Sequence, residues 1–415
     1  MKKNNLYILL FLSIIFPQSS SLGIYGFGEM VDSYDASSVG LGDSKFFSGN
    51  STSFSISSPS SYWKSSLVKL FTTLQFSESD FASNDIQENH FQVFSFMFPV
   101  GNNRACAFGM NPLYRTNMQL VEEDLNFIGA DSSPEGNPIA FRTTYDFSGG
   151  ISEFFIAYSM KINSGLSFGV RLSKLFGNSN NRYVLSLNDV SFDDEGNIEF
   201  NAPPSGGPYI SYGNYKNRYS GHSYNIEGRY AHNQMEVVLS YLETSSLKIK
   251  FTPEYDLVGY VNYSENNINS SIKQYGLGVK YLINDDFGIV FETHNTQSFK
   301  SFDFLNILKQ NSPDVFSFHF GLFNQYHLKD KGILNEFNLR VGFYNKLFSI
   351  NDVELSDLGL TFGFGFEFLD GRSSIDLSFL SGKREVDYTF NDEKYYKFIM
   401  SIASNEKWFQ RKGNK

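Results

Sequence analysis

Residues 358–368 read LGLTFGFGFEF, and residues 337–344 read FNLRVGFY. In both stretches, large apolar residues alternate with small or polar ones. Because successive side chains of a β-strand point to opposite faces, each stretch presents one apolar wall and one polar wall. A barrel that spans a lipid bilayer is built from strands of this kind.

The same alternation recurs from about Lys64 to the C-terminus. Each membrane span should hold about 9 to 11 alternating residues. On this criterion the predicted strands are 64–76, 89–99, 104–117, 141–161 (with a break at Gly149-Gly150), 165–177, 216–231, 234–246, 270–283, 286–298, 314–328, 334–347, 356–369, 373–384 and 394–403. The sequence therefore predicts an all-β fold, a closed antiparallel transmembrane β-barrel of about 14 strands.

The connections between these strands alternate between very short and very long. The long ones span 118–140, 178–215 and 247–269. Outer-membrane barrels have short periplasmic turns and long external loops. We therefore expect the long connections outside the cell and the N-terminal segment on the periplasmic side.

The composition excludes several other classes of protein. The chain has 415 residues, of which 17% are aromatic, and a formal net charge of -10. Helical membrane spans need runs of about 18 apolar residues, which only the first residues approach. The acidic balance argues against nucleic-acid partners. A soluble propeller is disfavoured because no blade repeat of about 40 residues is visible.

The beginning of the chain has the pattern of a secretory signal peptide. Two lysines precede an apolar core from Leu6 to Phe16, and small residues follow up to Ser21. We expect residues 1–21 to be a cleaved signal peptide.

Three further segments are expected after the signal peptide. Residues 22–63 are rich in Ser and Gly and have too little alternation for a strand pair, so they are interpreted as an N-terminal plug, or hatch. Residues 64–404 form the barrel, and residues 405–415 form a basic periplasmic tail.

Two short motifs in the plug carry a resemblance. The chain has Val39-Gly40-Leu41-Gly42 and then Ser58-Pro59-Ser60. With its size, strand rhythm and loop placement, the chain resembles the FadL-type outer-membrane transporters of hydrophobic compounds, the family of the long-chain fatty acid transporter and the aromatic-hydrocarbon channels. That family has a small-Gly-x-Gly stretch and an Asn-Pro-Ala tripeptide in its hatch. Here only the proline of the tripeptide is kept. The resemblance implies hatch roles for Gly40, Gly42 and Pro59.

The resemblance also implies a lateral opening in the third strand. The family has a kink there that opens the wall into the membrane, and the predicted strand 104–117 contains Gly109 and Pro112. Because proline cannot donate a ladder hydrogen bond, a local break in the wall is expected. The alternative is that Pro112 ends the strand near the outer rim.

Two groups of ligand-binding residues are expected. The family captures ligands on its third and fourth long loops, which implies Tyr212, Phe251 and Tyr255 here; the alternative is that these loops pack only against each other. If the ligand is an acid, inward-facing cations would bind its carboxylate. These candidates are Arg171, Arg229, Lys280 and Arg340, and the alternative is that they pair with Glu227, Glu292 and Glu367.

No catalytic group is expected. The chain has six histidines, and no serine can be placed beside any of them to form a nucleophile and base pair. We predict that the protein is not an enzyme and has no catalytic residues, metal site or cofactor.

The predicted function is passive uptake of hydrophobic small molecules, such as long-chain fatty acids, across the outer membrane of a Gram-negative bacterium. The expected partners are a hydrophobic small molecule or lipid and the outer-membrane lipids, including lipopolysaccharide, and the barrel is expected to be a monomer. The alternatives are a protein-binding module of a secretion system, like PorV, and a purely structural barrel. A filled lumen with large flat external loops would favour protein binding, and a continuous apolar pocket beneath a displaceable hatch would favour transport.

Overall fold

A computed structural model provides the fold. It describes residues 22, 27–49, 55–81, 84–128, 137–192, 198–200, 209–256, 266–299, 302–304, 308–310, 313–328, 334–350, 353–368, 372–385 and 392–406. The predicted signal peptide, residues 1–21, and residues 407–415 of the predicted tail lie outside this range.

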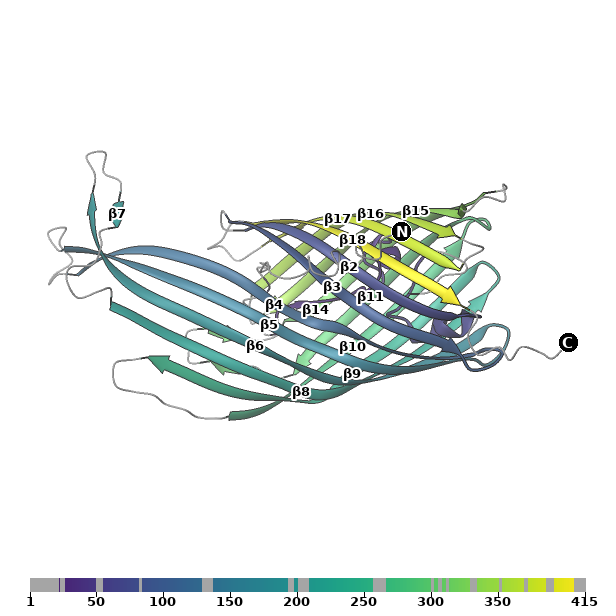
Figure 1. The fold of residues 1–415 in the computed structure, drawn as a ribbon, viewed down its shortest axis with the longest axis horizontal. Coiled ribbons are helices and arrows are strands. Elements are labelled where there is room, and N and C mark those ends of the chain that lie inside the picture. Colours follow the sequence, from purple (N-terminus) through teal and green to yellow (C-terminus); the bar gives the residue numbers. More distant parts are fainter. Residues whose placement is uncertain are drawn as a thin grey trace, which may run out of the picture.

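The wall is a closed antiparallel barrel of fourteen strands, which confirms the predicted fold class (Figure 1). The ring closes where the last strand pairs with the first, from Lys394↔Asp80 to Glu406↔Val68. In chain order the wall strands are β2 (Val68–Phe81), β3 (Asn84–Pro99), β4 (Arg104–Ile128), β5 (Asn137–Lys161), β6 (Leu166–Phe192), β8 (Tyr209–His232), β9 (Met235–Asp256), β10 (Asn266–Leu282), β11 (Phe287–Phe299), β14 (Asp314–His327), β15 (Leu334–Ile350), β16 (Val353–Phe368), β17 (Ser373–Arg384) and β18 (Glu393–Glu406).

Four shorter strands complete the described sheets. They are β1 (Glu29–Met30), which pairs with β4, β7 (Ile198–Phe200), which pairs with β6, and the separate pair β12 (Phe302–Phe304) and β13 (Leu308–Gln310).

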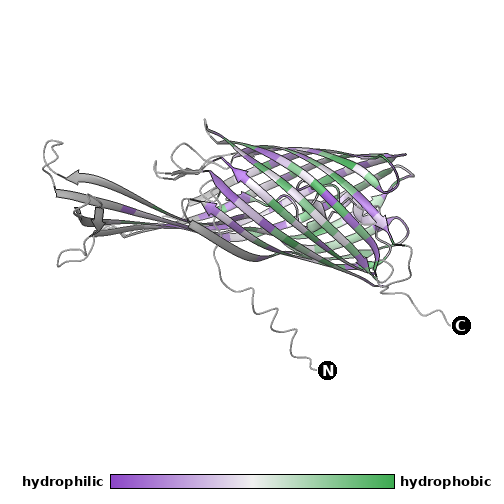
Figure 2. Ribbon diagram, turned by 90° about the horizontal axis from the view of Figure 1, so that it is seen from above, coloured by the Kyte–Doolittle hydropathy of each residue, from purple (hydrophilic) through white to green (hydrophobic). Residues whose placement is uncertain are grey.

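The outer face of the barrel is apolar. Apolar residues alternate with polar ones along the wall strands (Figure 2). Leu360, Phe362 and Phe379 are exposed on the outside, whereas Arg340 and Glu292 are buried inside. Tyrosines stand at both borders of the apolar band: Tyr158, Tyr230, Tyr281 and Tyr326 near the short turns, and Tyr224, Tyr241, Tyr275 and Tyr396 toward the other end. An apolar band between aromatic borders identifies a barrel of the outer-membrane type.

Five neighbouring strands continue far beyond the rest of the barrel (Figure 1). We call this extension the wing, and it consists of residues 116–128, 137–150, 177–192, 209–221 and 247–256 of β4, β5, β6, β8 and β9. β6 runs 15 residues past Gly177, from 177 to 192. At about 3.3 Å per residue, this distance is roughly 50 Å.

The wing corrects the predicted loops. Most of 118–140, 178–215 and 247–269 is strand, because β4 ends only at Ile128, β6 at Phe192 and β9 at Asp256. The prediction limited every strand to the length that a bilayer requires, whereas these strands remain paired beyond it. The predicted break at Gly149-Gly150 is also wrong, since β5 is continuous. Gly149 and Gly150 instead have φ of 113° and 148° at the base of the wing, a conformation that L side chains rarely adopt.

The wall has a seam between β3 and β4. Among the described residues these strands pair only from Phe94↔Met110 to Pro99↔Ala105. Beyond the pair Phe94↔Met110, on the wing side, β1 lies along the free edge of β4, with Met30 opposite Tyr114. The Val31 N–H donates to the Leu113 carbonyl at 2.9 Å, which extends the pairing by one residue. The N-terminal segment therefore occupies part of the wall position that β3 leaves.

The remainder of the described N-terminal segment fills the lumen. The short helix α2 (Ala36–Val39) begins at Asp35, whose carboxylate accepts from the Ser38 N–H at 2.8 Å, and it packs against β16, β17 and β18. The 3₁₀ helix η2 (Pro59–Lys64) packs on the other side, against β4, β5, β6 and β8. No helix in the described part of the chain is long and apolar enough to cross a membrane.

Candidate functional site

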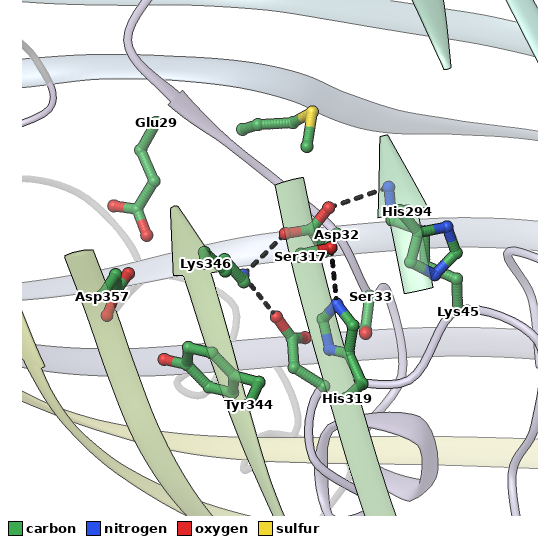
Figure 3. A network of polar contacts seen from close by, with 12 residues as sticks. Glu29, Asp32, Ser33, Lys45, His294, Ser317, His319, Tyr344, Lys346 and Asp357 are labelled. Carbon is green, nitrogen blue, oxygen red and sulfur yellow. Dashed lines mark hydrogen bonds and ion pairs between the residues drawn. The ribbon is translucent and has the colours of Figure 1, made fainter. Parts of the chain in front are cut away.

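A network of buried charges joins the hatch to the barrel wall (Figure 3). At its centre, Asp32 of the hatch lies 2.6 Å from Lys346 Nζ of β15 and 2.8 Å from Lys45 Nζ of the hatch. Lys346 also contacts Asp43 at 2.8 Å. Because an unpaired buried charge costs several kcal/mol, the hatch and the wall hold each other in place.

A second cluster holds β1. Glu29 lies 2.7 Å from Lys397 Nζ and 3.4 Å from an Arg384 nitrogen. Arg384 in turn pairs with Asp357 at 3.0 Å and with Glu393 at 2.8 Å. The segment that lines the seam is thus fixed to β17 and β18 on one side and, through Asp32, to β15 on the other.

Glu292 of β11 is a third anchor. Its carboxylate accepts hydrogen bonds from the Lys45 and Phe46 N–H groups at 2.8 and 3.0 Å, and from the Ser44 hydroxyl. Next to it, His319 Nδ1 lies 2.7 Å from the Gly42 carbonyl oxygen, so the ring nitrogen donates there. These contacts satisfy the backbone of a hatch loop that has no sheet or helix partner of its own.

Ion pairing and burial set the pKa values of two hatch groups. Burial alone would raise the pKa of the Asp32 carboxyl, but Lys346 and Lys45 outweigh it and hold this pKa well below its usual range. Burial lowers the pKa of Lys64 to about 8, and Arg229 and Lys280 act in the same direction while Glu236 opposes them.

The four predicted cations all face the lumen, and each has a carboxylate neighbour. Arg171 pairs with Glu153, and Arg229 pairs with Glu236 and lies 3.6 Å from Glu227. Lys280 contacts Glu236 at 3.2 Å, and Arg340 contacts Asp376 at 2.8 Å. Of the three expected partners, Glu227 lies beside Arg229, and Glu292 holds the hatch.

The hatch uses two of these cations as donors. An Arg229 nitrogen donates to the Phe46 carbonyl at 2.9 Å, and Arg340 Nε donates to the Ser48 carbonyl at 3.0 Å. Their role in the described structure is therefore to support the hatch, and their role in binding a ligand carboxylate stays a prediction.

A cavity of about 70 Å³ lies between the hatch and the inner face of the barrel wall. Val31, Leu113 and Ile272 are among its apolar lining residues, and Arg171 and Asp32 are among its charged ones. Arg171 is the only one of the four predicted cations that lines it. Met30 of β1 and Tyr114 of β4, which are opposite each other at the seam, also line this cavity.

The predicted hatch residues lie at close approaches between the hatch and the wall. A Cβ on Gly42, which has φ of 75°, would be 2.5 Å from the carbonyl oxygens of Phe320 and Phe343. Gly40 is also close-packed, because a Cβ added to it would lie 2.9 Å from the Gly363 Cα. Pro59 begins η2.

The predicted opening residues lie at the seam. Gly109 is in the part of β4 that pairs with β3, and Pro112 lies just after this pairing ends at Met110. Whether the seam opens stays a prediction. Tyr212, Phe251 and Tyr255 fall in β8 and β9, and their side chains lie outside the described part of the structure.

Sequence reasoning missed Glu29, Asp32, Lys346 and Lys397. Alternation places Lys346 on the polar face of its strand, so its inward direction could have been predicted. Asp32 and Glu29 carried no signal, because the path of a hatch without regular structure cannot be read from its residues. No group of three or more His, Cys, Asp or Glu in the described part of the chain is placed to hold a metal ion.

Solved structures with the same fold are outer-membrane channels. A mutant of the monoaromatic hydrocarbon channel TodX has 14% identity and a TM-score of 0.56, covering 90% of this chain and 99% of that one. The toluene transporter TbuX of Ralstonia pickettii has 11% identity and a TM-score of 0.51, covering 91% and 99%. A FadL homologue of Pseudomonas aeruginosa has 10% identity and a TM-score of 0.52, covering 92% and 100%. The predicted FadL-type resemblance is confirmed for the fold.

Curated proteins offer no match to the sequence. A family model does match it, under the description BamG, and the match extends over residues 1–414. The chain therefore belongs to the BamG family.

Proposed function

We propose that this outer-membrane barrel acts as a protein-binding module and presents its wing to another protein outside the cell. The wing is the observation that carries the proposal. Strands β4, β5, β6, β8 and β9 have 22 to 27 residues, although about 9 to 11 suffice to cross a bilayer. An ordered sheet of this length outside the membrane needs a role other than anchoring.

The filled lumen supports the same proposal. Pockets for small molecules usually measure about 300 to 1,000 Å³, whereas the cavity between the hatch and the wall measures about 70 Å³. The hatch is also tied to the wall through Asp32, Glu29 and Glu292. A lumen that the hatch fills in this way suits a protein that offers a surface rather than a passage.

Site-specific photo-cross-linking in cells tests this proposal. Gln119, Val121 and Arg142 are exposed on the β4 and β5 side of the wing, and each can be replaced by a photoreactive amino acid. We expect one discrete protein adduct from these positions and none from Asn233, an exposed residue in the short turn between β8 and β9. The absence of any protein adduct at all three wing positions would contradict the proposal.

A second candidate, passive uptake of hydrophobic small molecules such as long-chain fatty acids, is favoured by the seam. Met30 of β1 and Tyr114 of β4 line the cavity and are opposite each other at the seam. If the Glu29 to Asp32 segment withdrew, an apolar ligand beside Arg171 would reach the lipid. Uptake would then require the ion pairs of Glu29 and Asp32 to break.

A disulfide across β1 and β4 tests the second candidate. Met30 and Tyr114 are opposite each other, and the Val31–Leu113 hydrogen bond makes them the closer, non-hydrogen-bonded kind of pair. The variant Met30→Cys/Tyr114→Cys is made with Cys106→Ala, which removes the native thiol. Fatty-acid uptake should stop in the oxidised protein and return on reduction, with each single-cysteine variant as a control. Equal uptake in both states would exclude this route.

A further inference from the structure

The wing has an open edge along β4. Beyond β3, the position beside β4 is taken by β1, where Glu29 is opposite Arg115. Among the described residues, 116–128 of β4 pair only with β5, so no described strand lies on their other side (Figure 1). At about 3.3 Å per residue, this edge is roughly 43 Å long. The opposite border of the wing, β9, is instead covered by β10 as far as Phe251↔Asn266.

The backbone shows which groups face this edge. The Arg115 carbonyl faces β1, because a Cβ added to Gly28 would lie 2.1 Å from its oxygen. The Tyr114 carbonyl faces β5, 2.2 Å from a Cβ added to Gly150. In an antiparallel ladder the backbone groups alternate between the two sides, and no register shift follows Tyr114. The odd-numbered residues from Asn117 to Phe127 therefore direct their N–H and C=O groups toward the open edge.

The edge lacks most of the features that prevent another strand from adding. Exposed edges are usually protected by prolines, lysines, bulges or a short strand. Residues 116–128 contain no proline and no lysine, and their pairing with β5 has no bulge. A long edge with these donors and acceptors is suited to β-augmentation, in which an extended segment of another chain adds a strand.

The residues of this edge indicate which strand would fit. Thr116 and Met118 are buried on the inner face, whereas Gln119 and Val121 are exposed on the outer face. The charged residues of the stretch form the acidic run 122–124. An added strand should therefore place apolar residues inward at alternate positions and carry basic residues opposite this run.

Neither the N-terminal segment nor a second copy of the chain fits this edge. Leu22 packs in a cluster on β14, β15 and β16, away from β4. Both strands already beside β4, which are β1 and β3, pair with it in the antiparallel direction. A second copy in the same membrane would instead present β4 in parallel, with its acidic run beside the same run. The strand that fits therefore belongs to a different protein.

We propose that an extended segment of the partner protein pairs antiparallel with residues 116–128 of β4 and adds a sixth strand to the wing. This inference rests on the protein-binding proposal and names the element at which the partner docks. The open N–H and C=O groups supply affinity, and the alternating side chains supply specificity. Because β4 leads away from the membrane, the added strand runs toward it, in the direction of β1.

Proline substitutions on the open edge test the inference. In Gln119→Pro/Val121→Pro, two N–H groups that face the edge are lost, while the ladder to β5 stays intact, because proline is tolerated on edge strands. The matched control, Gln119→Ala/Val121→Ala, keeps both N–H groups. Each variant carries the photoreactive amino acid at Arg142 of β5, and the protein adduct formed in cells is measured. Heat-dependent gel mobility identifies a variant that fails to fold, and Val121→Pro alone then replaces it.

We expect the adduct to decrease about 10-fold or more in the proline variant, because hydrogen bonds to the added strand are lost, and to persist in the alanine control. In the adduct of the otherwise native protein, hydrogen exchange followed by mass spectrometry should be slower over residues 117–127 than in the free protein.

Three results would overturn the inference while leaving the protein-binding proposal intact. They are an undiminished adduct in the proline variant, loss of the adduct in both variants, and unchanged hydrogen exchange over residues 117–127. A native protein that gives no adduct at Arg142 would also overturn the inference. One that gives no adduct at any wing position would overturn the protein-binding proposal with it.

Discussion

The two sides of the barrel cross the same bilayer with strands of very different length. β14 to β18 have 12 to 17 residues, whereas β4, β5, β6, β8 and β9 have 22 to 27. The short side meets the needs of the membrane and, through Lys346, Arg340 and Arg384, holds the hatch. The long side forms the wing. Because Arg229 of β8 also supports the hatch, the difference teaches that both sides of the barrel fix the plug, whereas the proposed docking surface lies beyond the barrel on one side only.

Shortening the wing gives the largest expected effect and could break this comparison. Asn178 is paired with Arg218, so a two-residue Asn-Gly turn can replace residues 179–217, which removes most of the wing parts of β6 and β8 and leaves those of β4, β5 and β9. We expect the barrel to fold, because the described hatch anchors lie outside the deleted residues, and the protein adduct from Gln119, Val121 and Arg142 to be lost, because the remaining wing strands lose the two strands that join them. Heat-dependent gel mobility measures folding. A shortened protein that keeps the adduct would show that the β6 and β8 part of the wing is not needed for docking.

The short side should be the more sensitive to loss of a charge. Lys346→Met leaves Asp32 and Asp43 buried without their shared cation. Breaking a buried ion pair in this way typically costs about 3 to 5 kcal/mol. Urea unfolding of the protein in lipid vesicles would measure the loss. Lys383→Met, an exposed lysine on β17, is the control and should change little.

The base of the wing should respond to a smaller change. Gly149 has φ of 113°, and an added Cβ would lie 2.1 Å from the Asn178 carbonyl oxygen. We expect Gly149→Ala to cost on the order of 1 to 3 kcal/mol, the usual range for local backbone strain. Urea unfolding measures it, and Gly101→Ala in the turn between β3 and β4 is a useful comparison. Although Gly101 has φ of 120°, an added Cβ there meets nothing within 4 Å. If the two variants lost the same free energy of unfolding, backbone strain alone would account for the effect at Gly149.

The stability of the protein should also depend on pH through the hatch. The pKa of Lys64 is about 8 in the folded protein and about 10.4 in an unfolded chain. Between these values the unfolded state binds the extra proton, so stability should rise as the pH increases from 8 to 10.4. In the Lys64→Met variant, the melting temperature should depend less on pH over this window. A native melting temperature that falls with pH, with the same slope in the variant, would assign the dependence to other groups.

The hatch should also be held less tightly at acidic pH. The low pKa of Asp32 means that its contribution to stability is complete above its ordinary pKa of about 4 and is lost as the pH falls through the folded value. Limited proteolysis of the hatch at decreasing pH measures this loss. In the Asp32→Asn variant, the rate of proteolysis should no longer change with pH through this group. Identical proteolysis of the native protein and this variant at every pH below 4 would contradict the assignment.

The barrel could be predicted from the sequence because alternation with a period of two residues places apolar side chains toward lipid and polar side chains toward the lumen. The run 358–368 keeps this pattern for its whole length and appears intact in β16. The wing was missed because strands in water need no apolar outer face: Lys248 and Lys250 alternate with the buried Leu247 and Ile249, and this short pattern falls outside any membrane span.

The site was predicted less completely than the fold. Arg171, Arg229, Lys280 and Arg340 point inward, as their strand positions indicated. Their partners could be predicted only in part. Glu153 and Glu236 lie on strands next to those of their cations, whereas Asp376 of β17 lies two strands from Arg340 of β15. Ser48 and Phe46 belong to the hatch, whose path depends on contacts distant in sequence.

The position of β1 has a consequence for how the barrel is assembled. The residues from Glu29 to Asp32 precede every wall strand in the chain, yet they end between β3 and β4, inside a ring that closes only when β18 pairs with β2. The N-terminal segment must therefore enter before the ring closes, or thread through it afterwards. Because threading would require the Asp32 and Glu29 charges to pass an already packed interior, the order of insertion is expected to be plug first and final strand last.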